Sequence, residues 1–196
     1  MKTENRIEYK FILKNINSFL KTIERIGFQE IYTKRKINSL YLDTKSFSIY
    51  YHNLINDVNK KTIRVRHYDF DTDVCRFEEK LNLANGKYKN TREIKGNFTS
   101  FINKKTPIYK NYYPSSLVSY DRRYFQKDEF RITVDFNIVY KSTICRKIVH
   151  SSYEPNYCLA ELKLNKLHID EFKTNQLIPI KHSKYENSVT KLYKKN

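Results

Sequence analysis

The sequence has few cysteines and no long apolar run, and both shortages narrow the class of protein. Cys75, Cys145 and Cys158 are odd in number, widely separated and without a C-x-x-C pair. Neither a disulfide framework nor a zinc site of clustered ligands is therefore expected, and we interpret all three as reduced thiols. No apolar segment approaches the roughly 18 residues that a membrane-spanning helix needs, and the N-terminus lacks the apolar stretch of a signal peptide. We expect a soluble, cytoplasmic protein with no membrane segment of its own.

The sequence also lacks internal repeats, linkers and breaks in composition. Its 196 residues are 39% hydrophobic and 15% aromatic, which excludes disorder as the main description. We predict a single domain over residues 1–196, because this length suits one domain of ordinary to large size.

Positive charge is abundant. The chain has 38 basic and 21 acidic residues, for a formal net charge of +17, and such a field attracts polyanions such as nucleic acid, anionic membrane or polyphosphate. Lysine is a weak guide to the choice, because the richness in Lys, Asn, Ile and Tyr is typical of an AT-rich coding sequence. Only 11 of the basic residues are arginine, so the positions of the arginines are more informative.

Periodicity predicts mostly strands. Strands are expected near residues 6–11, 36–43, 61–68, 74–83, 87–94, 119–125, 130–139 and 157–164, with helices over 15–27, 170–177 and 187–193. Residues 97–116 have no clean period and are interpreted as loop and short helix. Asn85-Gly86 predicts a type I′ hairpin that would place Lys80 opposite Thr91. Glu78, Lys80, Lys87 and Lys89 would then share one face.

One face of nearly every predicted strand carries ionic side chains. Arg64 and Arg66, or Glu161 and Lys163, are spaced two residues apart, as strand neighbours on one face are. Such a face can be the wet side of an antiparallel sheet or, if the sheet closes, the lining of a lumen. Scarce arginines placed among carboxylates favour the lumen. Arginine and lysine there would bind phosphate oxygens, and carboxylates would hold a metal ion.

Eight short motifs follow one another over almost the whole chain. They are Arg6-x-Glu8-x-Lys10, Tyr41-x-Asp43-Thr44, Arg64-x-Arg66, Phe77-Glu78-x-Lys80, Tyr120-x-Arg122, Arg131-x-Thr133-x-Asp135, Glu161-x-Lys163 and Ser183-Lys184-Tyr185. This series closely resembles the VTC domain, the catalytic domain of the vacuolar transporter chaperone complex, which is a polyphosphate polymerase of the triphosphate tunnel (CYTH-like) superfamily.

The resemblance implies an α+β fold: a closed, mainly antiparallel barrel of about eight strands with flanking helices. It implies transfer of the γ-phosphate of ATP to inorganic polyphosphate, with Mn²⁺ or Mg²⁺ and release of ADP. The family's phosphate-binding roles fall on Lys10, Arg64, Arg66, Lys80, Lys89, Arg122, Arg131, Lys181 and Ser183. Lys184 would contact the transferred phosphate as the catalytic residue, and Glu161 and Glu8 would hold the metal.

Two features depart from the family pattern. The basic residue expected two positions after Lys89 is absent, and strict alternation turns Arg92 outward, so either a bulge re-aims Arg92 or Lys87 replaces it. The chain also lacks the additional domains of the eukaryotic complexes, so coupling to export would need a separate membrane partner.

The sequence also leaves other functions open. A tripolyphosphatase or thiamine triphosphatase of the same superfamily typically begins Glu-x-Glu-x-Lys, whereas the first position here is Arg6. A non-catalytic polyphosphate-binding module is a further alternative. A nucleic-acid binder is disfavoured, because Glu8, Glu78 and Glu161 lie inside the basic pattern and would repel a nucleic-acid backbone.

Several single residues receive structural interpretations. The five histidines, His52, His67, His150, His168 and His182, show no ligand spacing and are interpreted as packed or solvated. Glu78, Asp135 and Lys163 could line the lumen or serve only as ion-paired supports, and the residues alone do not choose between these roles.

Overall fold

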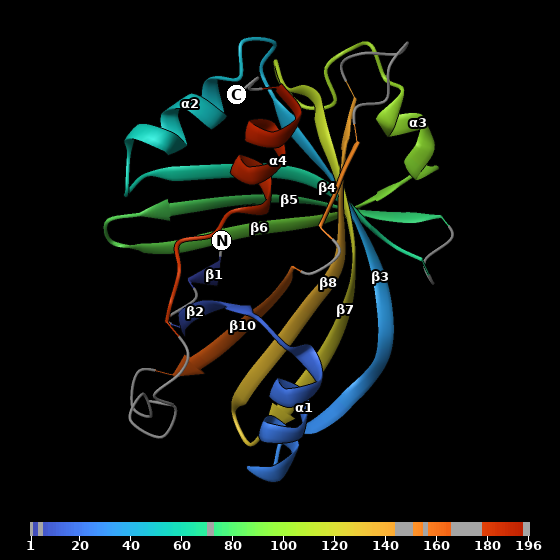
Figure 1. Ribbon diagram of the computed structural model, residues 1–196. Helices are drawn as coiled ribbons and strands as arrows, with labels where there is room; N and C mark the ends of the chain where they lie inside the picture. Colours follow the sequence, from blue (N-terminus) through green and yellow to red (C-terminus); the bar gives the residue numbers. More distant parts are fainter. Residues whose placement is uncertain are drawn as a thin grey trace.

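One sheet of ten strands and four helices make up the described part of the chain (Figure 1). The computed structural model describes residues 2–3, 6–69, 73–143, 151–154, 157–165 and 178–193. The strands are β1 (Lys2–Thr3), β2 (Arg6–Leu13), β3 (Gln29–Asp43), β4 (Lys60–Tyr68), β5 (Val74–Leu83), β6 (Gly86–Lys95), β7 (Tyr113–Lys127), β8 (Phe130–Ser142), β9 (Ser151–Glu154) and β10 (Cys158–Asn165). The helices are α1 (Ile16–Arg25), α2 (Ser48–Ile55), α3 (Phe98–Ile102) and α4 (Lys184–Tyr193).

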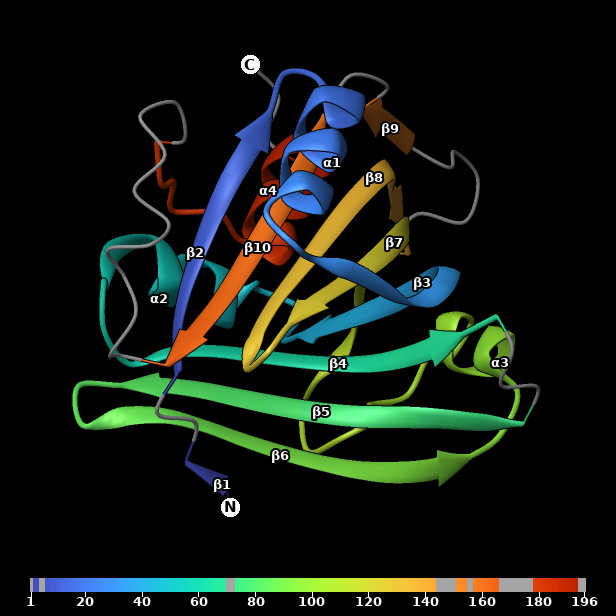
Figure 2. The ribbon, with the colours of Figure 1, turned by 90° about the horizontal axis from the view of Figure 1, so that it is seen from below.

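The strands follow one antiparallel path, β1-β6-β5-β4-β3-β7-β8-β10-β2, with β9 paired to β8. Seen from below, β4, β5 and β6 run across one side of a strongly curled sheet while β2, β10, β8 and β7 fan out above them (Figure 2). The predicted α+β class and the antiparallel sheet are confirmed.

Closure of the barrel is not confirmed. The path ends at β1 and β2, and no backbone ladder joins these two ends within the described residues. The two described residues of β1 pair with Lys89 and Tyr88 of β6. A side-chain contact spans the gap instead, with Lys87 Nζ on β6 lying 3.5 Å from Glu8 Oε2 on β2.

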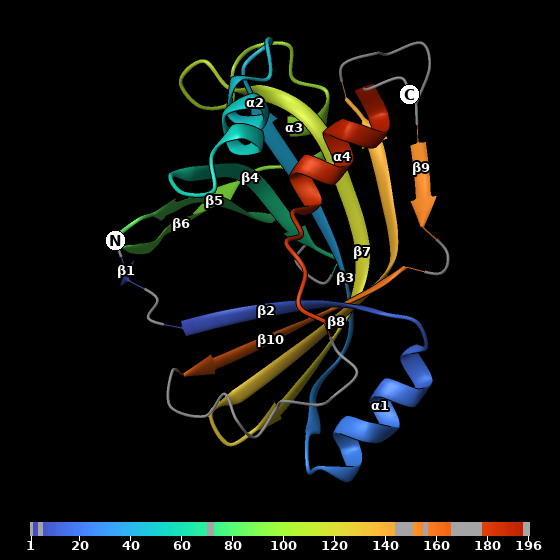
Figure 3. The same ribbon diagram turned by 60° about the vertical axis from the view of Figure 1, so that its left-hand side comes forward.

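Two apolar clusters stabilise the curled sheet, one at each end. Helix α1 buries Leu20 and Ile23 against β2, β7, β8 and β10 at one end. At the other end α4 packs inside the curl (Figure 3), where Tyr185 stacks on Tyr41 of β3 and the hydroxyls of Ser188 and Ser116 lie 2.7 Å apart. Helix α4 therefore covers part of the concave face.

The predicted strands and the helices at 15–27 and 187–193 are observed with shifted ends, and the short helix expected within 97–116 is α3. Cys75 and Cys158 are free thiols. The predicted helix at 170–177, together with Cys145, His150 and His168, lies outside the described residues.

The predicted hairpin register is wrong by two residues. Leu83 pairs with Gly86, so the turn residues are Ala84 and Asn85, and Lys80 lies opposite Lys89 rather than Thr91. Neither turn residue has a positive φ, which a type I′ turn would require at both positions. A shift of two residues preserves the side-chain alternation, so the face assignments of the two strands are unchanged.

Asp43 ties three elements together at the end of β3. Its buried carboxylate accepts hydrogen bonds from the backbone N–H groups of Ile49 (2.9 Å) and Tyr50 (3.0 Å) at the start of α2. It also accepts the backbone N–H of Thr44 (2.7 Å) and the hydroxyl of Tyr185 on α4. Asp43 thus supplies the cap for α2, whose own N-cap residue makes no side-chain cap bond.

We expect Asp43→Ala to lower the free energy of unfolding by about 2–4 kcal/mol, because it leaves several buried donors unpaired. Asp69→Ala, which removes an exposed carboxylate bonded to Asn38, is the matched control and should cost less than about 1 kcal/mol. Urea unfolding of both variants measures the difference. Equal losses would show that Asp43 has no special role.

Candidate functional site

The register places the predicted ionic residues on the concave face of the sheet. Arg64 on β4 lies directly between Tyr41 of β3 and Glu78 of β5, and residues opposite each other in an antiparallel pair share a face. The same holds for Glu161 of β10, which pairs with Lys10 of β2. Alternation along each strand then brings every second residue to this side.

These side chains line a cavity of about 530 Å³. Ten basic and four acidic residues contribute to its wall. Its lining is Glu8, Lys10, Tyr41, Asn53, Asp57, Lys60, Thr62, Arg64, Arg66, Lys80, Asn82, Lys89, Arg122, Glu161, Lys163, Lys181, His182, Ser183, Lys184, Tyr185, Glu186 and Asn187. A wall with this excess of cations attracts a multiply charged anion.

Glu78 holds one group of cations. Its carboxylate accepts a hydrogen bond from Arg64 Nε at 2.6 Å and lies 3.7 Å from Arg66 Nη1 and 3.1 Å from Lys89 Nζ. Burial alone would raise the pKa of Glu78, but the surrounding cations, Arg64 foremost, hold it far below its usual range. Glu78 therefore stays ionised and orients the arginines.

Asp135 holds a second group. It is fully buried and accepts two hydrogen bonds from Arg122, at 2.5 and 2.7 Å, and one from Lys184 Nζ at 2.5 Å. Burial would raise its pKa, yet Arg122 and Lys184 lower it below the ordinary value. Glu78 and Asp135 are thus ion-paired supports beneath the cavity wall, which answers the question that the sequence left open.

Two carboxylates face the cavity from neighbouring strands. Glu8 on β2 and Glu161 on β10 share Lys163, whose Nζ lies 3.2 Å from Glu8 and 3.5 Å from Glu161. Burial would raise the pKa of Glu161, but Lys163 and Arg122 hold it far below its usual range. Within the described residues no three Asp, Glu, His or Cys side chains gather into a metal site. A cation held here would rely on these two carboxylates and on its ligand's own oxygens.

Most of the predicted site residues lie together. Lys10, Arg64, Arg66, Lys80, Lys89, Arg122, Lys181, Ser183, Lys184, Glu8 and Glu161 line the cavity. Arg131 does not: it is exposed and is not part of the lining. The reason is its position at the start of β8, next to the β7–β8 turn and paired with Gln126.

The structure also shows where Arg92 and Lys87 lie, the two residues at which the sequence departs from the family pattern. Arg92 is exposed and its guanidinium stacks on the ring of Phe77, 4.7 Å from the centroid, on the convex side. It is not re-aimed by a bulge, as the unbroken β5–β6 register shows. Lys87 instead contacts Glu8 across the sheet gap.

The sequence did not indicate several residues at the rim of the concave cavity. Asn53 and Asp57 belong to α2 and the loop after it, and Asp57 pairs with Lys181 at 2.9 Å. Helix α2 has apolar residues nearly all round, so it lacks the one-sided pattern that identifies a surface helix. Asn187 and His182 also line the cavity, and only their closeness to Ser183 and Lys184 could have indicated this.

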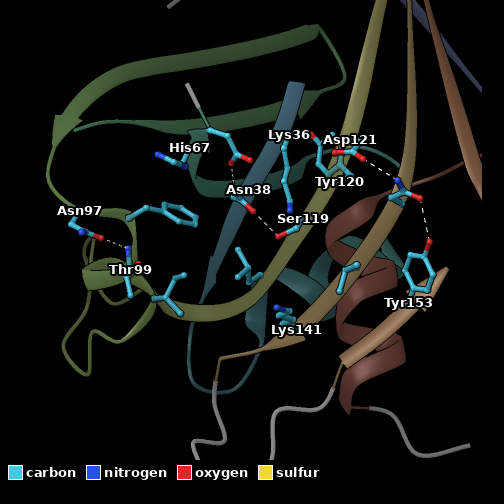
Figure 4. Close-up of a pocket in the computed structure, with 16 residues that line it drawn as sticks. Lys36, Asn38, His67, Asn97, Thr99, Ser119, Tyr120, Asp121, Lys141 and Tyr153 are labelled. Atoms are coloured by element: carbon cyan, nitrogen blue, oxygen red, sulfur yellow. Dashed lines mark hydrogen bonds between the residues drawn. The ribbon is translucent and has the colours of Figure 1, made fainter. Parts of the chain in front are cut away.

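A second cavity of about 720 Å³ lies on the opposite face of the same strands. Asn38, Ser119 and Tyr153 border it, with α3 along one side (Figure 4). Its ionic residues are of both signs, with Lys36 and Lys141 alongside Asp69 and Asp121. This wall has no excess of cations comparable with that of the concave face.

The comparisons with known proteins agree with this geometry. The family model of the VTC domain matches residues 5–112 and 92–193. The chain belongs to the VTC domain family. The resemblance drawn from the eight motifs is therefore confirmed. A search of curated proteins finds no match.

Solved structures share the fold of this VTC domain at low identity. A candidate adenylate cyclase from Vibrio parahaemolyticus aligns with a TM-score of 0.60 at 14% identity, covering 94% of this chain and 98% of that one. A candidate adenylate cyclase from Bacillus halodurans aligns with a TM-score of 0.62 at 13% identity, covering 99% of this chain and all of the other. The likeness concerns the fold alone. No helix in the described parts of this VTC domain is long and apolar enough to cross a membrane.

Lys80 makes the cavity sensitive to pH. Burial lowers the pKa of its ammonium to about 7, and the nearby Arg64 adds to this effect. A polyanion in the cavity would favour the charged lysine. The contribution of Lys80 to anion binding is therefore fully present below about pH 7 and is lost as the pH rises through the higher pKa of the complex.

We predict that tripolyphosphate binding at about pH 8 takes up a proton at Lys80. Calorimetric titration in two buffers of different ionisation enthalpy measures this uptake. In Lys80→Met the uptake should fall by nearly one proton per site, whereas Lys141→Met, which removes an exposed lysine of the convex face, should leave it unchanged. Identical uptake in the two variants would contradict the assignment.

Proposed function

We propose that this VTC domain is a metal-dependent phosphotransferase that adds the γ-phosphate of ATP to inorganic polyphosphate. A terminal phosphate oxygen of the polyphosphate attacks the γ-phosphorus, the bond from that phosphorus to the β,γ-bridging oxygen breaks, and ADP leaves. One observation carries the proposal: Arg64 and Arg122 are fixed by buried carboxylates, with Arg66 beside them, in a single cavity that also holds Lys184.

The arrangement suits phosphoryl transfer because this reaction asks a protein mainly for alignment and charge stabilisation. Arginine forks bind phosphate oxygens with defined geometry. Arg64 and Arg122 already have their Nε atoms engaged by Glu78 and Asp135. Their orientation is therefore set before a ligand arrives, and little reorganisation remains for the reaction.

Lys184 is proposed as the residue that contacts the transferred phosphate. Its Nζ donates to Asp135 and lies 4.7 Å from the centre of the Tyr120 ring. An ammonium has three donors, so one bond to Asp135 leaves two for phosphate oxygens. Lys10 is similar, since its Nζ donates once, to the carbonyl of His182 at 2.7 Å. Lys181 and Ser183 flank Lys184 at the cavity rim.

Glu8 and Glu161 are proposed to hold Mn²⁺ or Mg²⁺. Hard cations of this kind are commonly bound by one or two carboxylates together with substrate phosphates, and the donor set of two cavity-facing carboxylates fits this pattern. The bound ion would bridge phosphate oxygens and offset their charge. Lys163, which contacts both carboxylates, offsets their mutual repulsion and keeps them close together.

The decisive experiment is a product assay with ATP, Mn²⁺ and a pyrophosphate primer. We expect a ladder of polyphosphate lengths and release of ADP. Orthophosphate in place of the ladder would identify a triphosphatase, and binding without turnover would identify a polyphosphate-binding module. Glu161→Gln should reduce Mn²⁺-dependent turnover by about 100-fold or more, while Glu30→Gln, on the outer pair with Arg123, should have no effect. Wild-type turnover in Glu161→Gln would overturn the metal assignment.

A second prediction separates the cavity from general basicity. Arg66→Ala should weaken tripolyphosphate binding by about 10- to 100-fold, because it removes a charged donor from a buried site. Arg123→Ala removes the same charge from a part-exposed outer salt bridge with Glu30. This control should change affinity less than about twofold. Calorimetry on both variants, each checked for folding by circular dichroism, gives the comparison, and equal losses would indicate a basic surface rather than a tunnel site.

A further inference from the structure

His182 occupies an unusual position for a histidine with no assigned role. It lies in the segment Ile178–Ser183, which is held to β2 in both directions: Ile180 N–H donates to the Lys10 carbonyl at 2.8 Å, and Lys10 Nζ donates to the His182 carbonyl at 2.7 Å. His182 is 9% exposed and belongs to the cavity wall. The sequence interpretation, a packed or solvated histidine, did not place this residue in the cavity wall.

The hydrogen bonds around the ring define its tautomer. Asn187 Nδ2 lies 2.9 Å from His182 Nε2. An amide nitrogen can only donate, so Nε2 must accept, and the imidazole proton must then be on Nδ1. The ring also packs beside that of Tyr157, with the centroids 5.6 Å apart and a tilt of 31°.

Nδ1 is a buried donor without a partner among the described residues. A buried polar group left in this state costs free energy, and most such groups in proteins are satisfied. Arg66 Nε, in the same cavity wall, is also unpartnered within the described part of the chain. Both atoms belong to residues of one cationic cavity wall but have almost no exposed surface, so an acceptor entering from the cavity would reach them after a small movement of the wall.

The ring cannot act as a further cation. Burial, together with the nearby Lys184 and Lys10, lowers the pKa of His182 to about 3. The imidazole is therefore neutral at neutral pH in the ligand-free cavity. It offers one directional N–H in a wall whose other donors are mostly charged.

We propose that His182 is a phosphate-binding residue that donates a neutral hydrogen bond from Nδ1 to the phosphate chain, and that Asn187 fixes the tautomer that permits this. The inference rests on the proposed function, since it assigns a further contact to the same ligand. A neutral donor contributes position rather than charge. Its loss should weaken binding without changing how affinity depends on salt, whereas loss of a lysine should change both.

Two substitutions separate the ring nitrogens. In His182→Asn the amide nitrogen can take the place of Nδ1, because both are bonded to Cγ. In His182→Gln the amide can reach only the place of Nε2, and the donor to the ligand is lost. We expect His182→Gln to bind tripolyphosphate on the order of ten- to a hundredfold more weakly than wild type, with His182→Asn losing clearly less. The salt slope should stay that of wild type in both.

A measurement on the unmodified protein tests the same role of His182 without a substitution. Nitrogen-15 NMR of the histidine side chains should show His182 protonated on Nδ1, with the Nδ1 resonance shifting on addition of tripolyphosphate. An Nε2-protonated ring, an Nδ1 signal that ignores the ligand, or equal affinities of the two variants would overturn the role of His182 even if wild type binds normally. Failure of wild type to bind tripolyphosphate would instead overturn the proposed function, and this proposal with it.

Discussion

The cavity depends on two carboxylates that are themselves removed from solvent. Three arginines cannot be placed on the concave face of a curled sheet unless their charge is matched, because an unpaired buried ion costs several kcal/mol. Glu78 and Asp135 provide that match from β5 and β8. Each is shared by more than one cation, so the neutralisation is incomplete and the wall stays positive. The same bonds fix the guanidinium planes. Stability and anion binding therefore come from one set of contacts.

Alternation along strands made much of this site predictable. A residue's face follows from its parity, so Arg64 with Arg66, and Glu161 with Lys163, could be placed on one side without knowledge of the fold. Parity does not show which residues lie next to one another on adjacent strands. Glu78 meets Arg64 because β5 pairs with β4 at that register, and it meets Lys89 because the β5–β6 turn is Ala84-Asn85. The predicted hairpin register gave each residue of β5 and β6 the correct face of the sheet but the wrong cross-strand neighbours. The supporting role of Glu78 depends on those neighbours, so it could not be assigned from the sequence.

Parts of the site formed by long-range contacts were beyond prediction. The start of α2 is capped by Asp43 and Thr44, which accept the backbone N–H groups of Ile49, Tyr50 and Ser48 from several residues upstream. The N-cap position itself, Phe47, makes no side-chain cap bond. His182 enters the wall because Lys10, 172 residues away, binds its carbonyl. Arg131 shows the limit of parity itself, since the correct face at the end of a strand need not reach the cavity.

Net charge and local field are separate properties in this molecule. The convex cavity is the larger of the two, yet its wall carries lysines and the acids Asp69 and Asp121 in equal number, so their charges offset one another. On the concave face the cations outnumber the acids and several are buried, so each unit charge acts at a lower effective dielectric. A flexible polyanion gains from that field only if it can enter the curl and meet donors of fixed direction. A stiff duplex cannot follow such a path, and charge alone would not distinguish the two. Under the proposed function, the shape of the sheet, more than the excess of lysine, would set the selectivity for a phosphate chain.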